Sequence, residues 1–97
     1  MSLSGKFGGQ ATERFRQHLA HTLQVNNASK VILDLGHLTE LHMAGIRALV
    51  DARRTVLSLA LVHIPENVHR VIELSGTTDF FAIYEDKDSA LVAFQAE

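Results

Sequence analysis

The feature that most constrains the fold is a run of five residues, 31–35, that is nearly all apolar and rich in branched side chains. Such a run without polar alternation is typical of a β-strand that is buried on both of its faces. Strands of this kind occur in parallel sheets covered by helices, because a strand that faces water on one side alternates polar and apolar residues. Residues 31–35 therefore predict a central strand in an α/β domain.

Apolar runs and amphipathic stretches alternate along the rest of the chain, which indicates strands and helices laid in turn around a largely parallel sheet. Three further strands are expected, at residues 3–7, 58–64 and 80–84. Four helices are expected, at residues 10–24 and 44–57, from Pro65 to the residues before Gly76, and after Asp86. Residues 36–43 are predicted to be a connector between the central strand and the second helix.

Three residues mark helix ends. Pro65 can open the third helix, because its missing N–H costs nothing at a first helical position. Gly76 lies just past the last periodic residue, where a left-handed C-terminal cap favours glycine. Asp86 is expected to cap the amino end of the last helix. That helix is expected to bury three side chains: Ala90, Leu91 and Phe94.

The length and composition predict one soluble, folded domain over residues 1–97. A chain of 97 residues, of which 46% are apolar and 21% charged, is too hydrophobic to be disordered and too short for a second domain. No apolar run approaches the roughly 18 residues that indicate a membrane helix. Residues 1–9 lack the basic and apolar regions of a signal peptide. We expect no direct insertion into a membrane.

Charge and residue types exclude several function classes. A net charge of -2 argues against nucleic acid as a partner, because nucleic-acid binding normally needs a strongly basic face. The chain has no cysteine, which is compatible with a cytoplasmic location, and its six histidines form no metal-binding motif. No motif supplies a nucleophile with a base, and nothing pairs Asp34, at the end of the central strand, with a base. We predict no metal, no cofactor and no enzymatic activity.

Residues 31–49 resemble the signature region of STAS domains, a family named after sulphate transporters and anti-sigma-factor antagonists. In that family a strand ending in Asp-Leu is followed by a connector, an Asp-Ser-Ser-Gly or Asp-Ser-Thr-Gly turn, and an amphipathic helix. Asp34, Leu35, Gly45 and the helix start at 46–49 match this pattern. Residues 62–76 and 81–91 are similar to the later blocks of the family, so that the resemblance covers residues 3–94.

The resemblance implies a single-layer, mixed and mainly parallel sheet of four strands with four helices. The family usually has a further strand before the one at 3–7, so the chain is expected to be a fragment of a longer protein. As a function, the resemblance implies a regulatory, protein-interaction domain of the anti-sigma-factor antagonist type, with a kinase-like anti-sigma factor or a larger regulatory assembly as its partner. The alternative is the cytoplasmic domain of an anion transporter; ligand or nucleotide sensing has only general support from the family.

The turn before the second helix departs from the family. His42, Met43, Ala44 and Gly45 stand in place of Asp-Ser-Ser-Gly. In the antagonists the first serine accepts phosphate from a kinase that is also the anti-sigma factor, and Met43 occupies that position here without a hydroxyl. The usual switch therefore cannot operate at these positions, and we hypothesise a contact site held in the equivalent of the unphosphorylated state. The predicted docking surface comprises His37, Thr39, His42, Met43, Ala44, Gly45, Arg47 and Arg54.

The arginines of the second helix have two interpretations. Arg47, Arg53 and Arg54 could meet an acidic partner or a phosphate group. A solvated helix face explains them without a ligand, and we prefer that interpretation.

Overall fold

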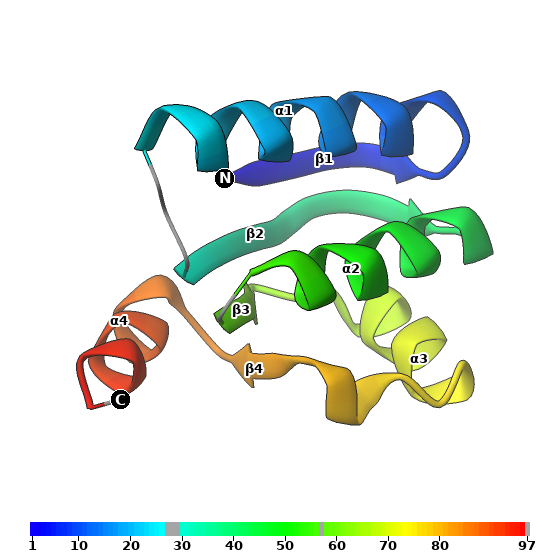
Figure 1. Cartoon of the computed structure of the whole chain (residues 1–97). Coiled ribbons are helices and arrows are strands. Elements are labelled where there is room, and N and C mark those ends of the chain that lie inside the picture. Colours follow the sequence, from blue (N-terminus) through cyan, green and yellow to red (C-terminus); the bar gives the residue numbers. More distant parts are fainter. Residues whose placement is uncertain (27–29, 57, 97) are drawn as a thin grey trace.

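The computed structural model describes residues 1–26, 30–56 and 58–96 (Figure 1). The strands in these ranges are β1 (Ser2–Phe7), β2 (Lys30–Leu41), β3 (Ser58–Val62) and β4 (Ala82–Tyr84). The helices are α1 (Gln10–Asn26), α2 (Met43–Thr55), α3 (Glu66–Leu74) and α4 (Lys87–Gln95), with a short 3-10 turn at Thr78–Phe80.

The four strands form one sheet in the order β1-β2-β3-β4, and each of the three pairings between these described strands is parallel. The predicted central strand is confirmed, because β2 pairs with β1 on one side and with β3 on the other. Val31, Leu33 and Leu35 are buried along it. The α/β fold class predicted from the sequence is confirmed.

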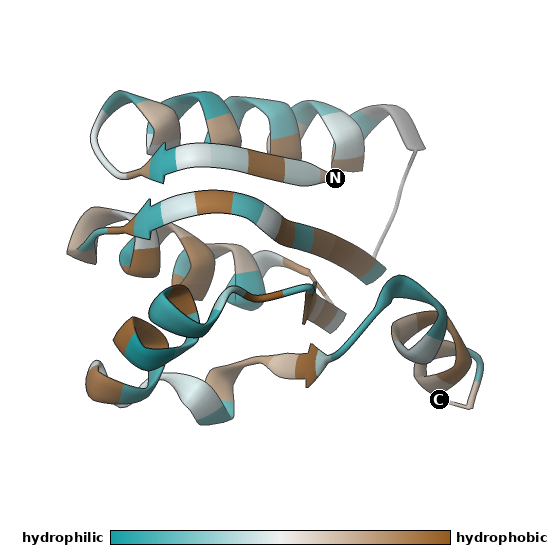
Figure 2. Ribbon diagram, turned by 180° about the vertical axis from the view of Figure 1, so that it is seen from behind, coloured by the Kyte–Doolittle hydropathy of each residue, from teal (hydrophilic) through white to brown (hydrophobic). Residues whose placement is uncertain are grey.

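The strand β2 is longer than predicted, and the expected connector at 36–43 is wrong for residues 36–41. The pairing with β1 continues past Leu35, with register shifts, until Phe7 lies opposite Leu41. After Leu35 the buried positions are Leu38 and Leu41, three residues apart, because irregularities in the pairing interrupt the strict alternation of a strand. Figure 2 shows the change, from mostly hydrophobic colours in the first half of β2 to interleaved hydrophilic ones toward its arrowhead.

The helix ends follow the sequence closely. Gly76 adopts a left-handed φ of 73° just after α3, as its position predicted. Asp86 caps α4, since its Oδ1 accepts a hydrogen bond of 2.8 Å from the backbone N–H of Ser89. Pro65 is the cap residue itself, so that α3 begins one residue later than predicted.

The side chains that α4 buries differ in one position from the prediction. Ala90 and Phe94 are buried against Ala60 and Val62 of β3. Leu91 is 40% exposed, because the next residue along a helix lies about 100° around its axis from the buried row. The expectation that Leu91 points inward is therefore wrong.

The core has two parts. The small part lies under α4, and the large part joins β1, β2 and β3 to the helices α1, α2 and α3. The largest fully buried side chains include Phe7, Leu33, Leu35, Leu49, Leu59, Leu61, Ile72, Val62 and Val68. The two aromatic rings of Phe7 and Phe15 meet edge to face with their centroids 5.4 Å apart, which ties β1 to α1. The sheet is thereby fixed to its helices close to the end where β2 leads into α2.

Candidate docking site at the turn between β2 and α2

The turn that leads from β2 into α2 is held by backbone hydrogen bonds. His42 precedes the helix with an extended backbone, and its N–H donates to the carbonyl of Phe7 at 3.1 Å. The carbonyl of His42 accepts the N–H of Ile46 at 3.0 Å, which closes the first turn of α2. The helix therefore starts at a point attached to the end of β1, a strand that lies 35 residues earlier in the chain at Phe7.

Gly45 shows how closely this turn is packed. A Cβ atom at position 45 would lie 2.4 Å from the carbonyl oxygen of Phe7 and 2.7 Å from its ring. On the other side of the turn, a Cβ atom at Gly8 would lie 2.9 Å from the Cβ of His42. Only glycine lets the three segments approach so closely, which is the physical reason for the residue that matches the family pattern.

Met43 lies on the outside of this packed turn. It is the first residue of α2 and its side chain is 60% exposed. Ala44 and Arg47, which follow it on the helix, are also exposed. The first turn of α2, residues 43–46, carries no acidic residue, so a large uncharged side chain stands at the positive end of the helix dipole.

Charged groups next to the turn form exposed pairs. The Nε2 of His42 lies 3.4 Å from Oε2 of Glu40, and the Nζ of Lys6 lies 3.8 Å from the same oxygen. Exposed pairs of this kind contribute little to stability, about 0–1 kcal/mol. They leave a mixed and easily rearranged set of charges beside Met43.

Thr39 connects the turn to a third element. Its backbone carbonyl accepts a hydrogen bond of 2.9 Å from Nδ2 of Asn67, near the start of α3. The carboxyl ends of β1 and β2 and the start of α3 thus lie together at one end of the parallel strands.

The structure brings together five of the eight predicted docking residues. Thr39, His42, Met43, Ala44 and Arg47 lie around the turn, and we call these five the turn surface. Gly45 is buried and lies beneath this surface.

Two predicted docking residues lie apart from the turn surface. His37 lies opposite Ser4 on β1, five strand residues before His42, a span of about 16 Å. Arg54 is in the last turn of α2, about 16 Å along the helix from Met43. The distance of His37 from the turn was missed because the predicted strand ended before it, whereas β2 continues to Leu41. The distance of Arg54 already followed from its place near the end of the predicted helix at 44–57.

A further pair of residues was missed by the sequence analysis. Nδ1 of His63 lies 3.3 Å from Oδ1 of Asp34, although no partner for Asp34 was predicted. The register of β2 and β3 places Asp34 beside Val62, so the next residue of the chain reaches it. The available signal was that Asp34 lies near the end of the apolar run 31–35 and His63 near the end of the apolar run 58–64, and that two such runs in adjacent parallel strands place their last residues side by side.

The surroundings of Asp34 favour its ionised form. The backbone N–H of Gly36 donates to its Oδ1 at 2.8 Å, and this bond is the main reason why the pKa of Asp34 is lowered; partial burial opposes the shift and His63 adds to it. His63 itself has a left-handed φ of 55°, which is uncommon for a residue with a side chain.

Neither a metal centre nor a membrane span is found in the part of the chain that the structure describes. No three side chains of His, Cys, Asp or Glu within residues 1–26, 30–56 and 58–96 are grouped to hold a metal ion. No helix among those residues has the length and apolar character needed to cross a membrane.

Comparison with known proteins identifies the family. The model of the STAS domain family matches residues 1–90, so the chain belongs to this family. No curated protein is significantly similar to it in sequence. One solved structure similar to it is that of the anti-sigma factor antagonist SpoIIAA in its unphosphorylated form, with a TM-score of 0.81, 15% sequence identity, and coverage of 99% of this chain and 86% of that chain. At this level of identity the likeness establishes the fold.

Proposed function

We propose that this STAS domain is a non-catalytic regulatory module of the anti-sigma-factor antagonist type, which docks a protein partner through the turn surface. The partner is a kinase-like anti-sigma factor or a larger regulatory assembly. The observation that carries the proposal is the exposure of Met43, 60%, at the first residue of α2, the position that the family pattern gives to the phosphoacceptor serine.

The packing around Gly45 supports a docking role for the turn. Because the first turn of α2 rests directly on Phe7, Met43 is presented on a firm support. Methionine is adaptable at binding surfaces, where its flexible and polarisable side chain can fit different partners. A rigid support below an adaptable contact favours binding with little loss of backbone entropy.

The missing hydroxyl has a consequence for regulation. A phosphate on a serine would add about -1.5 to -2 charges at this helix end and change the docking of a partner strongly. Met43 cannot accept a phosphate, so the turn surface stays in the equivalent of the unphosphorylated, partner-competent form. Regulation of this domain, in the proposal, comes from its abundance or from its partner instead of from phosphorylation of the turn.

A pull-down with matched variants tests the docking surface. Met43→Asp places a charge on the turn surface, and Leu74→Asp places the same charge on an equally apolar residue of α3 that is 81% exposed. The proposal predicts that one protein is retained by the wild type and by Leu74→Asp and lost by Met43→Asp, with an affinity at least about tenfold lower in a direct measurement. If all three proteins retain the same partners with equal affinity, the turn is not the interface.

A phosphorylation assay tests the loss of the switch. The wild type and Met43→Ser are incubated with a cognate anti-sigma kinase and ATP, and their intact masses are measured. We expect one phosphate on Met43→Ser and none on the wild type. Phosphate on Thr39 or Ser58 of the wild type would contradict the proposal.

The alternative function, the cytoplasmic domain of an anion transporter, is tested by the sequence that flanks this domain. Membrane spans in that sequence would favour the transporter alternative.

A further inference from the structure

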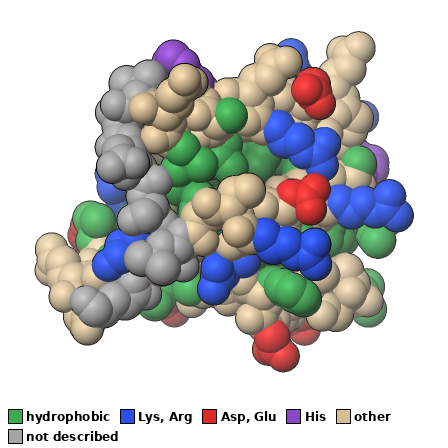
Figure 3. All heavy atoms as spheres, viewed as in Figure 1, with side chains coloured by type: hydrophobic (Ala, Val, Ile, Leu, Met, Phe, Trp, Pro, Cys, Tyr) green, Lys and Arg blue, Asp and Glu red, His purple; other side chains and the backbone are tan. Residues whose placement is uncertain are grey.

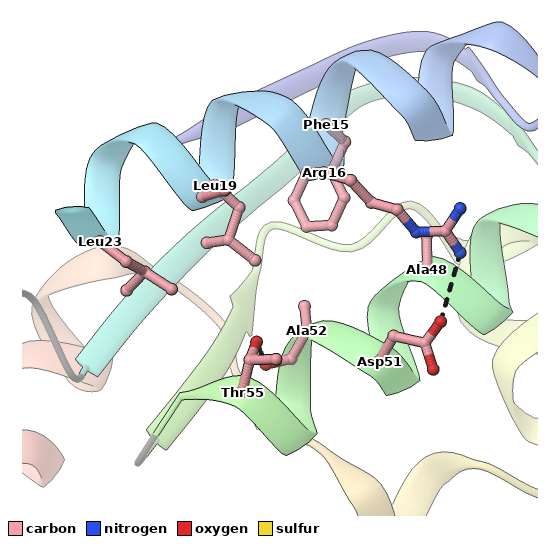
Figure 4. A pocket seen from close by; sticks show the side chains of 9 residues that line it. Phe15, Arg16, Leu19, Leu23, Ala48, Asp51, Ala52 and Thr55 are labelled. Carbon is pink, nitrogen blue, oxygen red and sulfur yellow. Dashed lines mark hydrogen bonds and ion pairs between the residues drawn. The ribbon is translucent and has the colours of Figure 1, made fainter.

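A hollow lies between α1 and α2, on a face of the molecule that the proposed docking does not use. It is a cavity of about 210 Å³ (Figure 4). Its walls are apolar: Phe15, Leu19 and Leu23 line it from α1, and Ala48 and Ala52 from α2. Figure 4 shows the aromatic and aliphatic side chains of α1 directed toward the alanines of α2.

The small side chains of α2 create this space. Ala48 and Ala52 are one helical turn apart and both face α1, where larger residues would fill the gap between two helices. An apolar cavity of roughly 150 Å³ can stay dry and bind a benzene-sized molecule. The hollow is therefore large enough to hold a small apolar molecule and too small to hold a helix or a strand.

One end of the hollow is charged. Nη2 of Arg16 donates to Oδ2 of Asp51 at 3.3 Å, across the gap from α1 to α2. This bond uses one of the five N–H donors of a guanidinium, and the remaining donors are suited to a second carboxylate. The Arg16 side chain is 43% exposed, so its free donors can be reached from solution.

The helices around the hollow are basic, although the chain as a whole has a net charge of -2. Together α1 and α2 carry five arginines and two carboxylates. Arg47, Arg53 and Arg54 of α2 form no ion pair with any described residue. Figure 3 shows the result: an apolar recess between the two helices, with Lys and Arg side chains gathered beside it. The local field therefore favours an anion over a cation.

We propose that this hollow binds a small amphiphilic carboxylate, with an unbranched or aromatic apolar body of about six to ten carbon atoms in the cavity and its carboxylate on Arg16. The apolar walls select the apolar part of the ligand, and the guanidinium of Arg16 together with the basic helices selects its carboxylate. Asp51 competes with the ligand for Arg16 and limits its affinity.

The probe for this proposal is sodium octanoate, titrated into the isotope-labelled chain and followed by two-dimensional NMR and calorimetry. We expect saturable shifts at the amides of Phe15, Leu19, Ala48 and Ala52. Octyltrimethylammonium, which has the same body and the opposite charge, should bind at least about tenfold more weakly. Absence of saturable octanoate binding, or equal affinity for the two probes, would overturn the proposal. The hollow would then hold a side chain of a partner protein or no ligand.

Two substitutions in the same ion pair should act in opposite directions. Arg16→Gln removes the contact to the head and should weaken octanoate binding by roughly tenfold, the size of one charge-assisted hydrogen bond. Asp51→Asn removes the competing carboxylate and should strengthen binding severalfold. Arg14→Gln, with the same change of charge outside the lining of the hollow, is the matched control and should have a much smaller effect. A general loss of structure would weaken octanoate binding in both variants, so it cannot produce these opposite effects. Weaker binding by Asp51→Asn would contradict the proposal.

A third substitution tests the cavity itself. Ala20 lines the hollow from an exposed position of α1, so that Ala20→Leu can obstruct it without disturbing the core. We expect octanoate binding to fall at least about tenfold, with an unchanged circular dichroism spectrum. Met43→Asp should bind octanoate as the wild type does, so that failure of this proposal and failure of the docking proposal are distinguishable. Unchanged binding by Ala20→Leu would place the ligand elsewhere.

Discussion

The first turn of α2 and the middle of the same helix differ in how much space surrounds them. At Gly45 even one added carbon atom would lie 2.4 Å from the backbone of Phe7. At Ala48 and Ala52, one and two turns later, the helix faces a cavity of about 210 Å³. One helix is therefore fixed at its amino end, where Met43 is presented, and loosely packed along α1, where we propose a ligand. Tight packing suits the turn, which must keep its shape to dock a partner. Free space suits the hollow, which must accommodate a ligand.

The largest expected effect is that of Gly45→Ala in the tightly packed turn. Alanine is favoured over glycine in a helix by about 1 kcal/mol, but its methyl group would overlap the carbonyl of Phe7. We expect the free energy of unfolding to fall by about 3 kcal/mol, at the upper end of overpacking costs. Urea denaturation measures it, with Ala44→Ser as a neighbouring control that changes stability by less than about 0.5 kcal/mol. Wild-type stability in Gly45→Ala would mean that Phe7 and the turn can move apart.

Thr12 extends the tight region into the start of α1. The residue is buried, and its Oγ1 donates to the carbonyl of Gly9 at 2.6 Å, in the loop that packs against His42. Thr12→Val keeps the shape of the side chain and removes this hydrogen bond, so the free energy of unfolding should fall by about 1 kcal/mol. Thr22→Val makes the same change on the same helix, where the hydroxyl has no partner among the described residues, and should be nearly neutral. Equal effects of the two substitutions would show that the loop does not depend on this bond.

The middle of α2 should tolerate a larger addition than the turn. Ala52→Leu adds three heavy atoms on the side that faces the hollow, against the single atom added by Gly45→Ala. We expect the free energy of unfolding to stay within about 1 kcal/mol of the wild type, because the new side chain gains apolar burial and needs little rearrangement. The same urea titration compares the two. A loss as large as that of Gly45→Ala would contradict the contrast between the two segments.

The smallest effect is expected at Asp34, outside both segments of α2. Its pKa is lowered in the folded state, mainly by the N–H of Gly36, so the folded protein favours the ionised form. The resulting stabilisation is present above the unfolded pKa, about 3.9, and is lost as the pH falls through the lower folded value. The side chain is 36% exposed, so the gain is small.

Unfolding by urea between pH 3 and pH 7 measures this contribution when the wild type is compared with Asp34→Asn. The difference between the two proteins should be present at pH 7 and shrink toward pH 3. Asp86, whose pKa is lowered by its hydrogen bond to Ser89, is unchanged in both proteins and cancels in the comparison. A difference that is constant with pH would show that Asp34 acts through its shape alone.

The parts of the fold that were predictable depend on residues close together in the chain. The buried strand at 31–35, the cap at Asp86 and the left-handed Gly76 are each decided by a short pattern of side chains, and the structure confirms them. The wrong predictions arise where distant segments meet. β2 continues to Leu41 because β1 pairs with it, and Leu91 is exposed because only one row of α4 reaches β3.

The site divides in the same way. The absence of a hydroxyl at Met43 follows from the sequence alone, since it is a property of one side chain in one motif. The exposure of Met43, the contact of Gly45 with Phe7, the approach of His63 to Asp34 and the hollow between α1 and α2 were decided by the tertiary structure. Each of these depends on the distance between residues far apart in the chain, and no periodicity within one segment encodes that distance.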